Sequence, residues 1–488
     1  MPGWQIALIM MIGYLVIALA VGMMAGRGQD SSSLNEFAVA GGKLNLFVMW
    51  FLMGGAVFSA FSFLGAPGWA FSKGAPSLYI ITYTAFAILP WYIIGPKIGR
   101  IGKKHNFYTV AAFMKGRFNS PTLAIIVGLI ALFASVQYLA TQMSGMALIF
   151  NIMTEGRIPF WLGALVSYGI VVIYVATGGL RAAAWSDVFQ GLLMIIISWA
   201  VGLTIVYQLH GGTTEMFTTI ARETPEFLQI GKAGSTMGSV AYTTTILVSV
   251  IGFLMWPHLF SKSYATTPRT IKKTVLAYPI FALFLVPLLL VGFAARGVID
   301  SGQLESPDQV LPFLITTVLN LPGWLYGLVG AGALAAAMST ADAITHSASL
   351  EVTDGVVKNI WKNLSDKRTL LIMRIGVFVI GGIAYYITVF GGQGLIALLL
   401  GAYGSIVQFA PGVYSALYWR RATTKGVISG LVVGTLVNYY FQLVAESTPF
   451  EIHAGILGLI ANVLVMVTVS YLTKAQDDEV VRKYVDAK

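Results

Sequence analysis

Residues 332–347 read Gly332-Ala333-Leu334-Ala335-Ala336-Ala337-Met338-Ser339-Thr340-Ala341-Asp342-Ala343-Ile344-Thr345-His346-Ser347, so hydroxyls, a carboxylate and an imidazole stand within a strongly apolar neighbourhood. On a helix, positions i, i+3, i+4 and i+7 share a face, so Ser339 and Thr340 lie beside Ala336. Small residues allow a neighbouring backbone to approach, and hydroxyl oxygens can then hold a small, hard cation. A seam of small residues that only packs two helices together has the same pattern. This stretch alone leaves both interpretations open.

The composition places these residues inside a membrane. The 488 residues are 57% hydrophobic and only 10% charged, whereas soluble domains carry roughly a quarter charged residues. We therefore expect an all-α polytopic membrane protein. The sequence has no cysteine, which excludes disulfides and thiol chemistry, and no Walker-type or HExxH motif, which argues against ATP-driven or zinc-dependent activity. The N-terminus begins with an apolar span and no basic region, so we expect a retained helix and not a cleaved signal.

Apolar runs of suitable length predict thirteen transmembrane helices. The predicted spans are approximately residues 4–25, 44–71, 77–96, 121–150, 159–178, 185–209, 238–258, 274–296, 322–350, 370–390, 394–418, 426–445 and 452–473.

The loop charges predict the orientation. With the N-terminus outside, 25 of the 30 Lys and Arg residues fall on the inner side, as the positive-inside rule requires. The outer side keeps Lys73, Arg157, Arg222, Lys232 and Arg296. We expect the N-terminus outside and the C-terminus inside, and the +10 net charge then reflects inner loops and not nucleic-acid binding.

Two of the predicted spans are poor helix material. The second contains Gly54-Gly55 and Gly65-Ala66-Pro67-Gly68, and the seventh contains Gly252 and Pro257. Each is the first span of a group of five, spans 2–6 and 7–11. Paired irregular spans in corresponding halves point to a transporter site built on broken helices, although Gly and Pro are common in membrane helices in any case.

Three stretches resemble the sodium/solute symporters, the family of proline, pantothenate, monocarboxylate and sialic acid permeases and of animal sodium/glucose transporters. They are Ala176-Thr177-Gly178-Gly179-Leu180-Arg181-Ala182-Ala183-Ala184-Trp185-Ser186-Asp187-Val188-Phe189-Gln190, then Ala336-Ala337-Met338-Ser339-Thr340, and the basic turn Tyr418-Trp419-Arg420-Arg421-Ala422-Thr423-Thr424-Lys425-Gly426. The likeness is strongest to the bacterial monocarboxylate and pantothenate permeases.

The resemblance implies a leucine-transporter-type core of five plus five inverted helices, with one helix before it and two after. The implied division is an N-terminal helix and inner loop (1–43), a first repeat (44–209), an outer loop (210–237), a second repeat (238–418), two peripheral helices (419–473) and a cytoplasmic tail (474–488). It also implies alternating access, in which a bound cation favours substrate binding and the substrate favours cation binding equally.

The resemblance further implies a Na⁺ site between the second and ninth spans. Its ligands would be the backbone carbonyls of Gly55, Phe58 and Ala336 and the hydroxyls of Ser339 and Thr340. Carbonyls freed by a broken helix can replace the water around an ion. Neutral oxygens suit Na⁺, whereas Mg²⁺ and Ca²⁺ usually need carboxylates.

Two carboxylates, Asp187 and Asp342, fall in or at the edge of predicted spans, where charges are costly and are functional candidates. Some family members use the first for a second sodium, but Asp342 and Ala343 stand where those members have hydroxyls. Asp342 could share a second cation with Asp187, could carry a proton, or could pair with His346 four residues on. We interpret His258, beside Pro257, as an inner-gate or loop residue.

The resemblance also implies a substrate site at the middle of the membrane, and that site lacks Lys and Arg. Its candidate residues are Phe58, Ser59, Ser62, Gln137, Thr141, Gln142, Ser249, Phe253, Trp256, Tyr403 and Gln408. Each of these could equally be a core packing residue.

From these features we expect Na⁺-coupled symport of a short organic acid such as lactate, pyruvate, propionate or acetate. Pantothenate, a proline-like amino acid, or a proton-coupled variant that uses Asp342 and Asp187 are the alternatives. An enzyme is disfavoured because Ser347 and His346 diverge on a helix, and neither a channel pore motif nor a signalling domain is evident. We expect a bacterial cell-membrane protein whose partners are its small-molecule substrate, Na⁺ and lipid, with no nucleic acid and no obligate protein partner.

Overall fold

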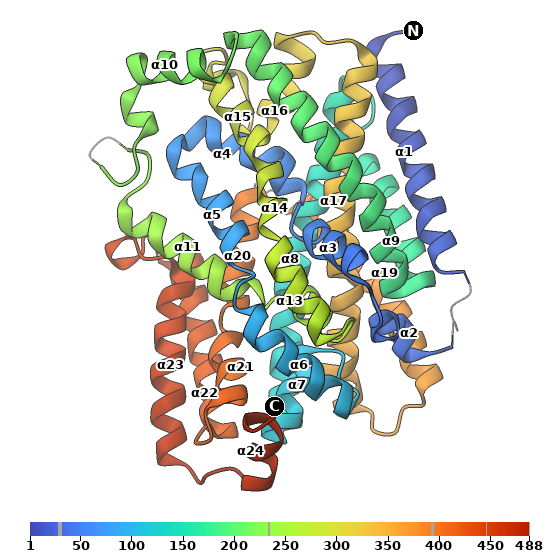
Figure 1. Cartoon of the computed structure of the whole chain (residues 1–488), viewed down its shortest axis with the longest axis vertical. Coiled ribbons are helices and arrows are strands. Elements are labelled where there is room, and N and C mark those ends of the chain that lie inside the picture. Colours follow the sequence, from blue (N-terminus) through green and yellow to red (C-terminus); the bar gives the residue numbers. More distant parts are fainter. Residues whose placement is uncertain (28–31, 233–234, 392–394, 446, 488) are drawn as a thin grey trace.

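The structure is a computed structural model, and it describes residues 1–27, 32–232, 235–391, 395–445 and 447–487. Within these ranges the chain is helical, and its one β-type contact is an isolated bridge between Arg296 and Ile299. The predicted all-α class is therefore confirmed. The chain termini lie toward opposite ends of the long axis (Figure 1).

The first half of the chain contains α1 (Gly3–Ala25), α2 (Leu34–Val39), α3 (Leu46–Gly55), α4 (Ala66–Lys73), α5 (Tyr79–Phe86), α6 (Trp91–His105), α7 (Val110–Phe118), α8 (Pro121–Met153), α9 (Phe160–His210), α10 (Thr213–Glu223) and α11 (Ser239–Phe253). The second half contains α12 (Pro257–Phe260), α13 (Pro268–Ala277), α14 (Pro279–Ala282), α15 (Val286–Ala295), α16 (Val310–Phe313), α17 (Gly323–Val352), α18 (Lys358–Ile360), α19 (Asp366–Phe390), α20 (Leu395–Ile406), α21 (Phe409–Tyr418), α22 (Thr424–Tyr439), α23 (Ala454–Leu472) and α24 (Asp478–Val485).

Helix α17, which carries the stretch 332–347, is the central helix of the fold. In its most apolar 18-residue window 94% of the residues are buried, against 33% for α1 and for α19. It packs against α1, α8, α9 and α19. A helix that is surrounded on all sides cannot leave its hydroxyls and carboxylates to water, so they must bond to the protein or to a ligand.

Both irregular spans are broken, as the sequence predicts. Between α3 and the π-helical turn η2 (Phe61–Gly65) the helix is interrupted at residues 56–59, and α4 follows η2 directly. Between α11 and α12 the axes bend by 48°. The glycine pair Gly54-Gly55 ends α3, and Pro257 begins α12, as expected from the weak helix propensity of glycine and the preference of proline for a helix start.

Helix α9 contains two predicted spans joined by a turn. It runs for 51 residues, about 77 Å at 1.5 Å per residue, which is far longer than the roughly 30 Å of a bilayer core. Gly179 interrupts it with φ 53° and ψ −145°. A Cβ at Gly179 would lie 2.5 Å from Phe37 O, so both the backbone angle and the close approach require glycine.

The length and apolar character of the described helices give eight membrane-crossing candidates, or up to eleven if each of three bent pairs is one span. This agrees with a polytopic membrane protein. The count of thirteen spans, the side on which each terminus lies and the division into two inverted repeats remain predictions.

The C-terminal helix α24 packs against α7 and α21. Lys97, in the middle of α6, is 9% exposed and donates hydrogen bonds to Leu417 O at 3.0 Å and Val485 O at 2.7 Å. Arg420 donates to both carboxylate oxygens of Asp486, at 2.6 and 2.8 Å. The tail predicted as residues 474–488 is therefore docked on the helix ends, as far as it is described.

Candidate cation and substrate site

The break after α3 frees two backbone carbonyls. In a continuous helix, Gly55 O would accept from Ser59 N and Phe58 O from Ser62 N. Instead, Ser59 N donates to Ser62 Oγ at 3.3 Å, and Ser62 N donates to Ser59 O at 2.9 Å. Ala60 N, also released by the break, donates to Gln142 Oε1 at 2.9 Å. The broken segment is thus held open by side chains.

The freed carbonyls face the two hydroxyls of α17. Ser339 Oγ lies 3.0 Å from Gly55 O, 3.5 Å from Phe58 O and 3.0 Å from Ala336 O. Thr340 Oγ1 lies 3.0 Å from Gly55 O and 3.2 Å from Phe58 O. The structure therefore brings all the predicted Na⁺ ligands together, and we name these five oxygens the cation cradle.

The cation cradle is dry and uncharged. Ser339 and Thr340 have no exposed surface, and Phe58 is 1% exposed. In this structure the hydroxyls of Ser339 and Thr340 donate hydrogen bonds to the carbonyls. An ion in the centre would instead be met by the lone pairs of all these oxygens, since a hydroxyl can turn its proton away. A set of neutral oxygens on two helices matches a monovalent ion better than Mg²⁺ or Ca²⁺.

Asp187 of α9 lies against the cation cradle. A Cβ on Gly55 would be 3.0 Å from Asp187 Cγ, so glycine at this position lets the carboxylate approach the broken segment. Asp342 lies on α17, and its Oδ2 accepts a hydrogen bond from Tyr174 OH at 2.8 Å. Both aspartates have no exposed surface. Their other three carboxylate oxygens accept no hydrogen bond within the described part of the chain.

Three sequence interpretations need correction. The pairing of Asp342 with His346 is wrong, because His346 Nε2 bonds to Phe37 O at 2.9 Å while Asp342 bonds to Tyr174. Lys262 does not lie in an inner loop with the other basic residues, because it is 1% exposed and donates to Leu52 O at 2.6 Å. The loop interpretation of His258 is wrong, because His258 lies in α12 and is 2% exposed; its role at an inner gate stays a prediction.

Several residues near the carboxylates were not predicted. Tyr174 bonds to Asp342, Gln190 Nε2 donates to Tyr14 OH at 2.9 Å, and Tyr14 OH lies 3.6 Å from Met338 Sδ. Gln190 ends the quoted family-like stretch and could have been singled out from it. Nothing in the sequence around Tyr14 distinguishes it from an apolar span residue.

Two aromatic candidates of the substrate site, Trp256 and Tyr403, lie together. The ring centroid of Trp256 is 5.3 Å from that of Tyr403 and 4.9 Å from that of Tyr138. Trp256 follows the break after α11, and Tyr403 comes from α20. Tyr83, whose ring centroid is 6.3 Å from that of Tyr403, extends the group. We name these four residues the aromatic group; Tyr83 and Tyr138 were not predicted.

Other predicted substrate residues are held by the protein itself. Thr141 Oγ1 donates to Gln137 O at 3.1 Å and Ser249 Oγ to Thr245 O at 2.8 Å. Gln142 supports the broken segment through Ala60 N. The rings of Phe58 and Phe253 pack on Phe281 and Tyr278, at 5.4 and 6.1 Å between centroids.

Gln408 points away from the aromatic group. Its Nε2 donates to Gly404 O and Gly455 O, at 3.1 and 3.0 Å, and its Oε1 accepts from Asn462 Nδ2 at 3.2 Å. Its side chain therefore joins the span of α20 and α21 to α23, and we leave it out of the substrate site.

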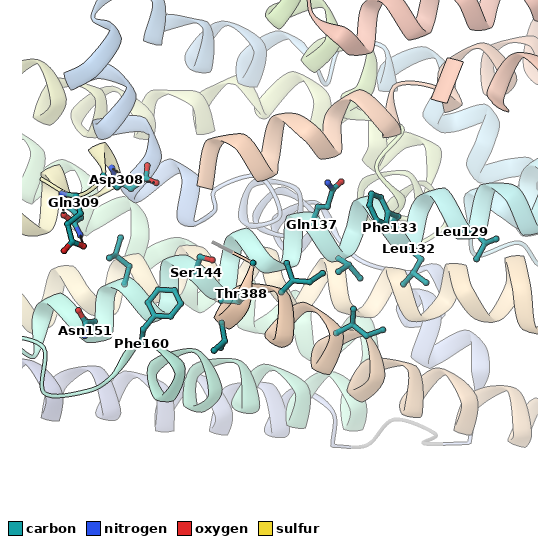
Figure 2. A pocket seen from close by; sticks show the side chains of 18 residues that line it. Leu129, Leu132, Phe133, Gln137, Ser144, Asn151, Phe160, Asp308, Gln309 and Thr388 are labelled. Carbon is teal, nitrogen blue, oxygen red and sulfur yellow. Dashed lines mark hydrogen bonds between the residues drawn. The ribbon is translucent and has the colours of Figure 1, made fainter. Parts of the chain in front are cut away.

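A cavity of about 1200 Å³ follows α8 beside the site. Figure 2 shows side chains of α8 from Leu129 to Asn151 along it, with Asp308 and Gln309 near one end and Thr388 beside α8. Gln137 lines this cavity, whereas the other predicted substrate residues do not. The cavity therefore meets the predicted site only at Gln137.

The family profile described as "Sodium:solute symporter family" matches residues 37–434 of this chain. The chain belongs to the sodium:solute symporter family. It is 30% identical to the uncharacterized symporter YhjB of Bacillus subtilis over 486 residues, which cover 96% of this chain and 97% of that protein. It is 25% identical to a monocarboxylate transport permease protein of Rhizobium johnstonii (96% and 97% covered) and to the sodium/proline symporter of Staphylococcus aureus (96% and 93% covered).

The fold of this symporter-family chain is shared with solved transporters. The structure of a Na⁺-coupled sialic acid symporter superposes with a TM-score of 0.81, at 18% identity, over 97% of this chain and 99% of that one. The predicted family is therefore confirmed, and the relatives are transporters and not enzymes. A multi-pass membrane protein agrees with both the family and the apolar helices.

Proposed function

We propose that this chain is a Na⁺-coupled symporter that carries a small organic acid across the bacterial cell membrane by alternating access. The observation that carries the proposal is the cation cradle, in which Gly55 O and Phe58 O lie within 3.5 Å of both Ser339 Oγ and Thr340 Oγ1, and Ala336 O lies 3.0 Å from Ser339 Oγ. Helices α3 and α17 are far apart in the sequence, and the fold brings oxygens of the broken second span and of α17 into one buried cluster.

The broken second span can couple the ion to the substrate. Gly55 and Phe58 offer carbonyls to the ion, while Ser59 and Ser62, on the same interrupted segment, belong to the proposed substrate site. An ion that orders residues 55–58 therefore also orders the two serines. By linkage, whatever affinity Na⁺ adds for the substrate, the substrate adds for Na⁺.

The proposed substrate site consists of the aromatic group together with Ser59, Ser62 and Gln137. Tyr and Trp offer an apolar body with a hydroxyl or N–H at one end. Such a site suits a short acid whose carboxylate is oriented by hydrogen bonds and by the positive charge of the nearby ion. The 25% identity with a monocarboxylate permease supports this class.

A proline-like amino acid is the second candidate, because the chain is also 25% identical to a sodium/proline symporter. Pantothenate is a third candidate and rests on the sequence resemblance alone. Asp187 and Asp342 are candidates for a second cation site or for a proton path, since their oxygens are buried and largely unpartnered.

The test is uptake into proteoliposomes that contain the purified chain. Lactate, pyruvate, propionate, acetate, pantothenate and proline are offered as labelled substrates under an inward Na⁺ gradient or an inward proton gradient, each alone. We expect accumulation of a monocarboxylate that requires the Na⁺ gradient. Accumulation under the proton gradient alone would contradict Na⁺ coupling, and accumulation of proline but no acid would contradict the substrate class.

A further inference from the structure

Three charged side chains lie buried beside the cation cradle: Asp187 of α9, Asp342 of α17 and Lys262 of the 3-10 turn η5 (Ser261–Ser263). The two aspartates have no exposed surface, and Lys262 is 1% exposed. Lys262 Nζ bonds to Leu52 O, three residues before Gly55, where Asp187 approaches the broken segment, and Asp342 lies two residues after Thr340. We name these three residues the inner charge cluster.

The carboxylates of the inner charge cluster need positive charge. Both oxygens of Asp187 and Oδ1 of Asp342 accept no hydrogen bond from the described residues, and Tyr174 OH is the one donor to Asp342 Oδ2. A buried carboxylate without a cation or donors costs several kcal/mol. The arrangement therefore calls for cations near these oxygens.

Lys262 supplies one of those charges without a direct ion pair. Its Nζ donates to Leu52 O at 2.6 Å, one turn before Gly55, and among the described ion pairs it has no carboxylate within 4.0 Å. The ammonium is thus fixed by the backbone of α3, one turn from the position at which Asp187 approaches that segment. Since the three groups are buried, the field between them is weakly screened.

The second charge is the ion in the cation cradle. Asp187 approaches the cradle at Gly55, where a Cβ would stand 3.0 Å from its Cγ. One Na⁺ in the cradle and one ammonium would balance two carboxylates. A further cation would leave an excess positive charge in a dry site.

We propose that the Lys262 ammonium takes the place of a second coupling cation at Asp187 and Asp342, so that one Na⁺ is carried per cycle. The inference rests on the proposed function, because it counts the ions that accompany the substrate. Lys262 follows the broken seventh span, and it bonds to α3 of the broken second span. The tethered cation therefore stays with the broken helices, while both carboxylates stand on α9 and α17.

The test counts bound sodium. The purified full-length chain is titrated with ²²Na⁺, and bound ions per protein are measured at saturation. We expect one Na⁺ for the wild type, two for Lys262→Gln, and one again for Lys262→Gln combined with Asp342→Asn. Lys262→Met is measured in parallel, in case the glutamine variant fails to fold.

Lys97→Gln is the matched control. Lys97 is also a buried lysine that donates to backbone carbonyls, so its loss reproduces the structural cost without removing charge from the carboxylates. We expect this variant to bind one Na⁺. Lys262→Arg, which keeps the charge, should also bind one.

Two results would overturn the inference: a wild type that binds two Na⁺, or Lys262→Gln and Lys262→Met variants that fold and still bind one. If the wild type binds one Na⁺ that Ser339→Ala with Thr340→Val abolishes, and these two neutral variants also bind one, only the role of Lys262 fails. A wild type that binds no Na⁺ overturns both this inference and the proposed function.

Discussion

The combined substitution Ser339→Ala and Thr340→Val should abolish Na⁺-dependent uptake while the protein still folds. In the structure these hydroxyls are two of the five cradle oxygens and meet Gly55 O and Phe58 O at 3.0–3.5 Å. A hydrogen-bond-type interaction with a charged group contributes about 1.5–3 kcal/mol. Loss of one hydroxyl should therefore weaken Na⁺ binding about 10- to 150-fold, and loss of both should remove it from the measurable range.

The same substitution has a cost in stability. It leaves two buried carbonyls, Gly55 O and Phe58 O, without their hydroxyl donors, at about 1–3 kcal/mol each. We expect a lower Tm in detergent but a cooperative transition. In Thr340→Val alone, Gly55 O keeps its 3.0 Å bond from Ser339, so this single variant should lose less stability.

The assay measures ²²Na⁺ binding and Na⁺-driven uptake side by side, with Ser347→Ala as control. Ser347 lies on the same helix, is 2% exposed, and bonds to the carbonyl three residues back at 3.1 Å, as Ser339 does at 3.0 Å. We expect wild-type Na⁺ dependence in the control. Normal Na⁺ dependence in the double variant would refute the assignment of the cradle.

Three further predictions concern the same architecture. Gly55→Ala should stop Na⁺-driven uptake, because its Cβ would lie 3.0 Å from Asp187 Cγ, whereas Gly382→Ala, with nothing within 4 Å, should not change it. Replacing Na⁺ with choline should lower the Tm of the wild type, since an ion at 100 times its Kd stabilises by about 2.7 kcal/mol; an equal Tm in both salts would argue against a Na⁺ site. Trp256→Phe should raise the KM for substrate and leave ²²Na⁺ binding unchanged, because the indole belongs to the aromatic group and not to the cradle; a change in Na⁺ binding alone would contradict this division.

The cation cradle could be predicted because its ligands fall in two short stretches with recognisable landmarks. The break after Gly55 follows from its glycines, and the hydroxyls of Ser339 and Thr340 are adjacent on an apolar helix. The separation of the fifth and sixth spans was likewise predicted as two apolar runs, 159–178 and 185–209, although the positive φ of Gly179 was not.

The surroundings of the carboxylates could not be predicted, because they depend on contacts between distant segments. Lys262 bonds to Leu52 across 210 positions, and Tyr174 to Asp342 across 168. The helical spacing of Asp342 and His346 left a pair open as one of three alternatives, but the imidazole bonds to Phe37 O of α2. Helical periodicity reports which residues share a face and not which neighbour that face meets.

Na⁺-gradient-driven accumulation tests the central claim most directly. Proteoliposomes with the wild type, the Ser339→Ala/Thr340→Val variant or Ser347→Ala are loaded without Na⁺ and given a labelled monocarboxylate with external Na⁺ at constant pH. The account predicts concentrative uptake by the wild type and by Ser347→Ala, and none by the double variant. Equal uptake by all three proteins, or uptake that does not depend on Na⁺, would contradict it.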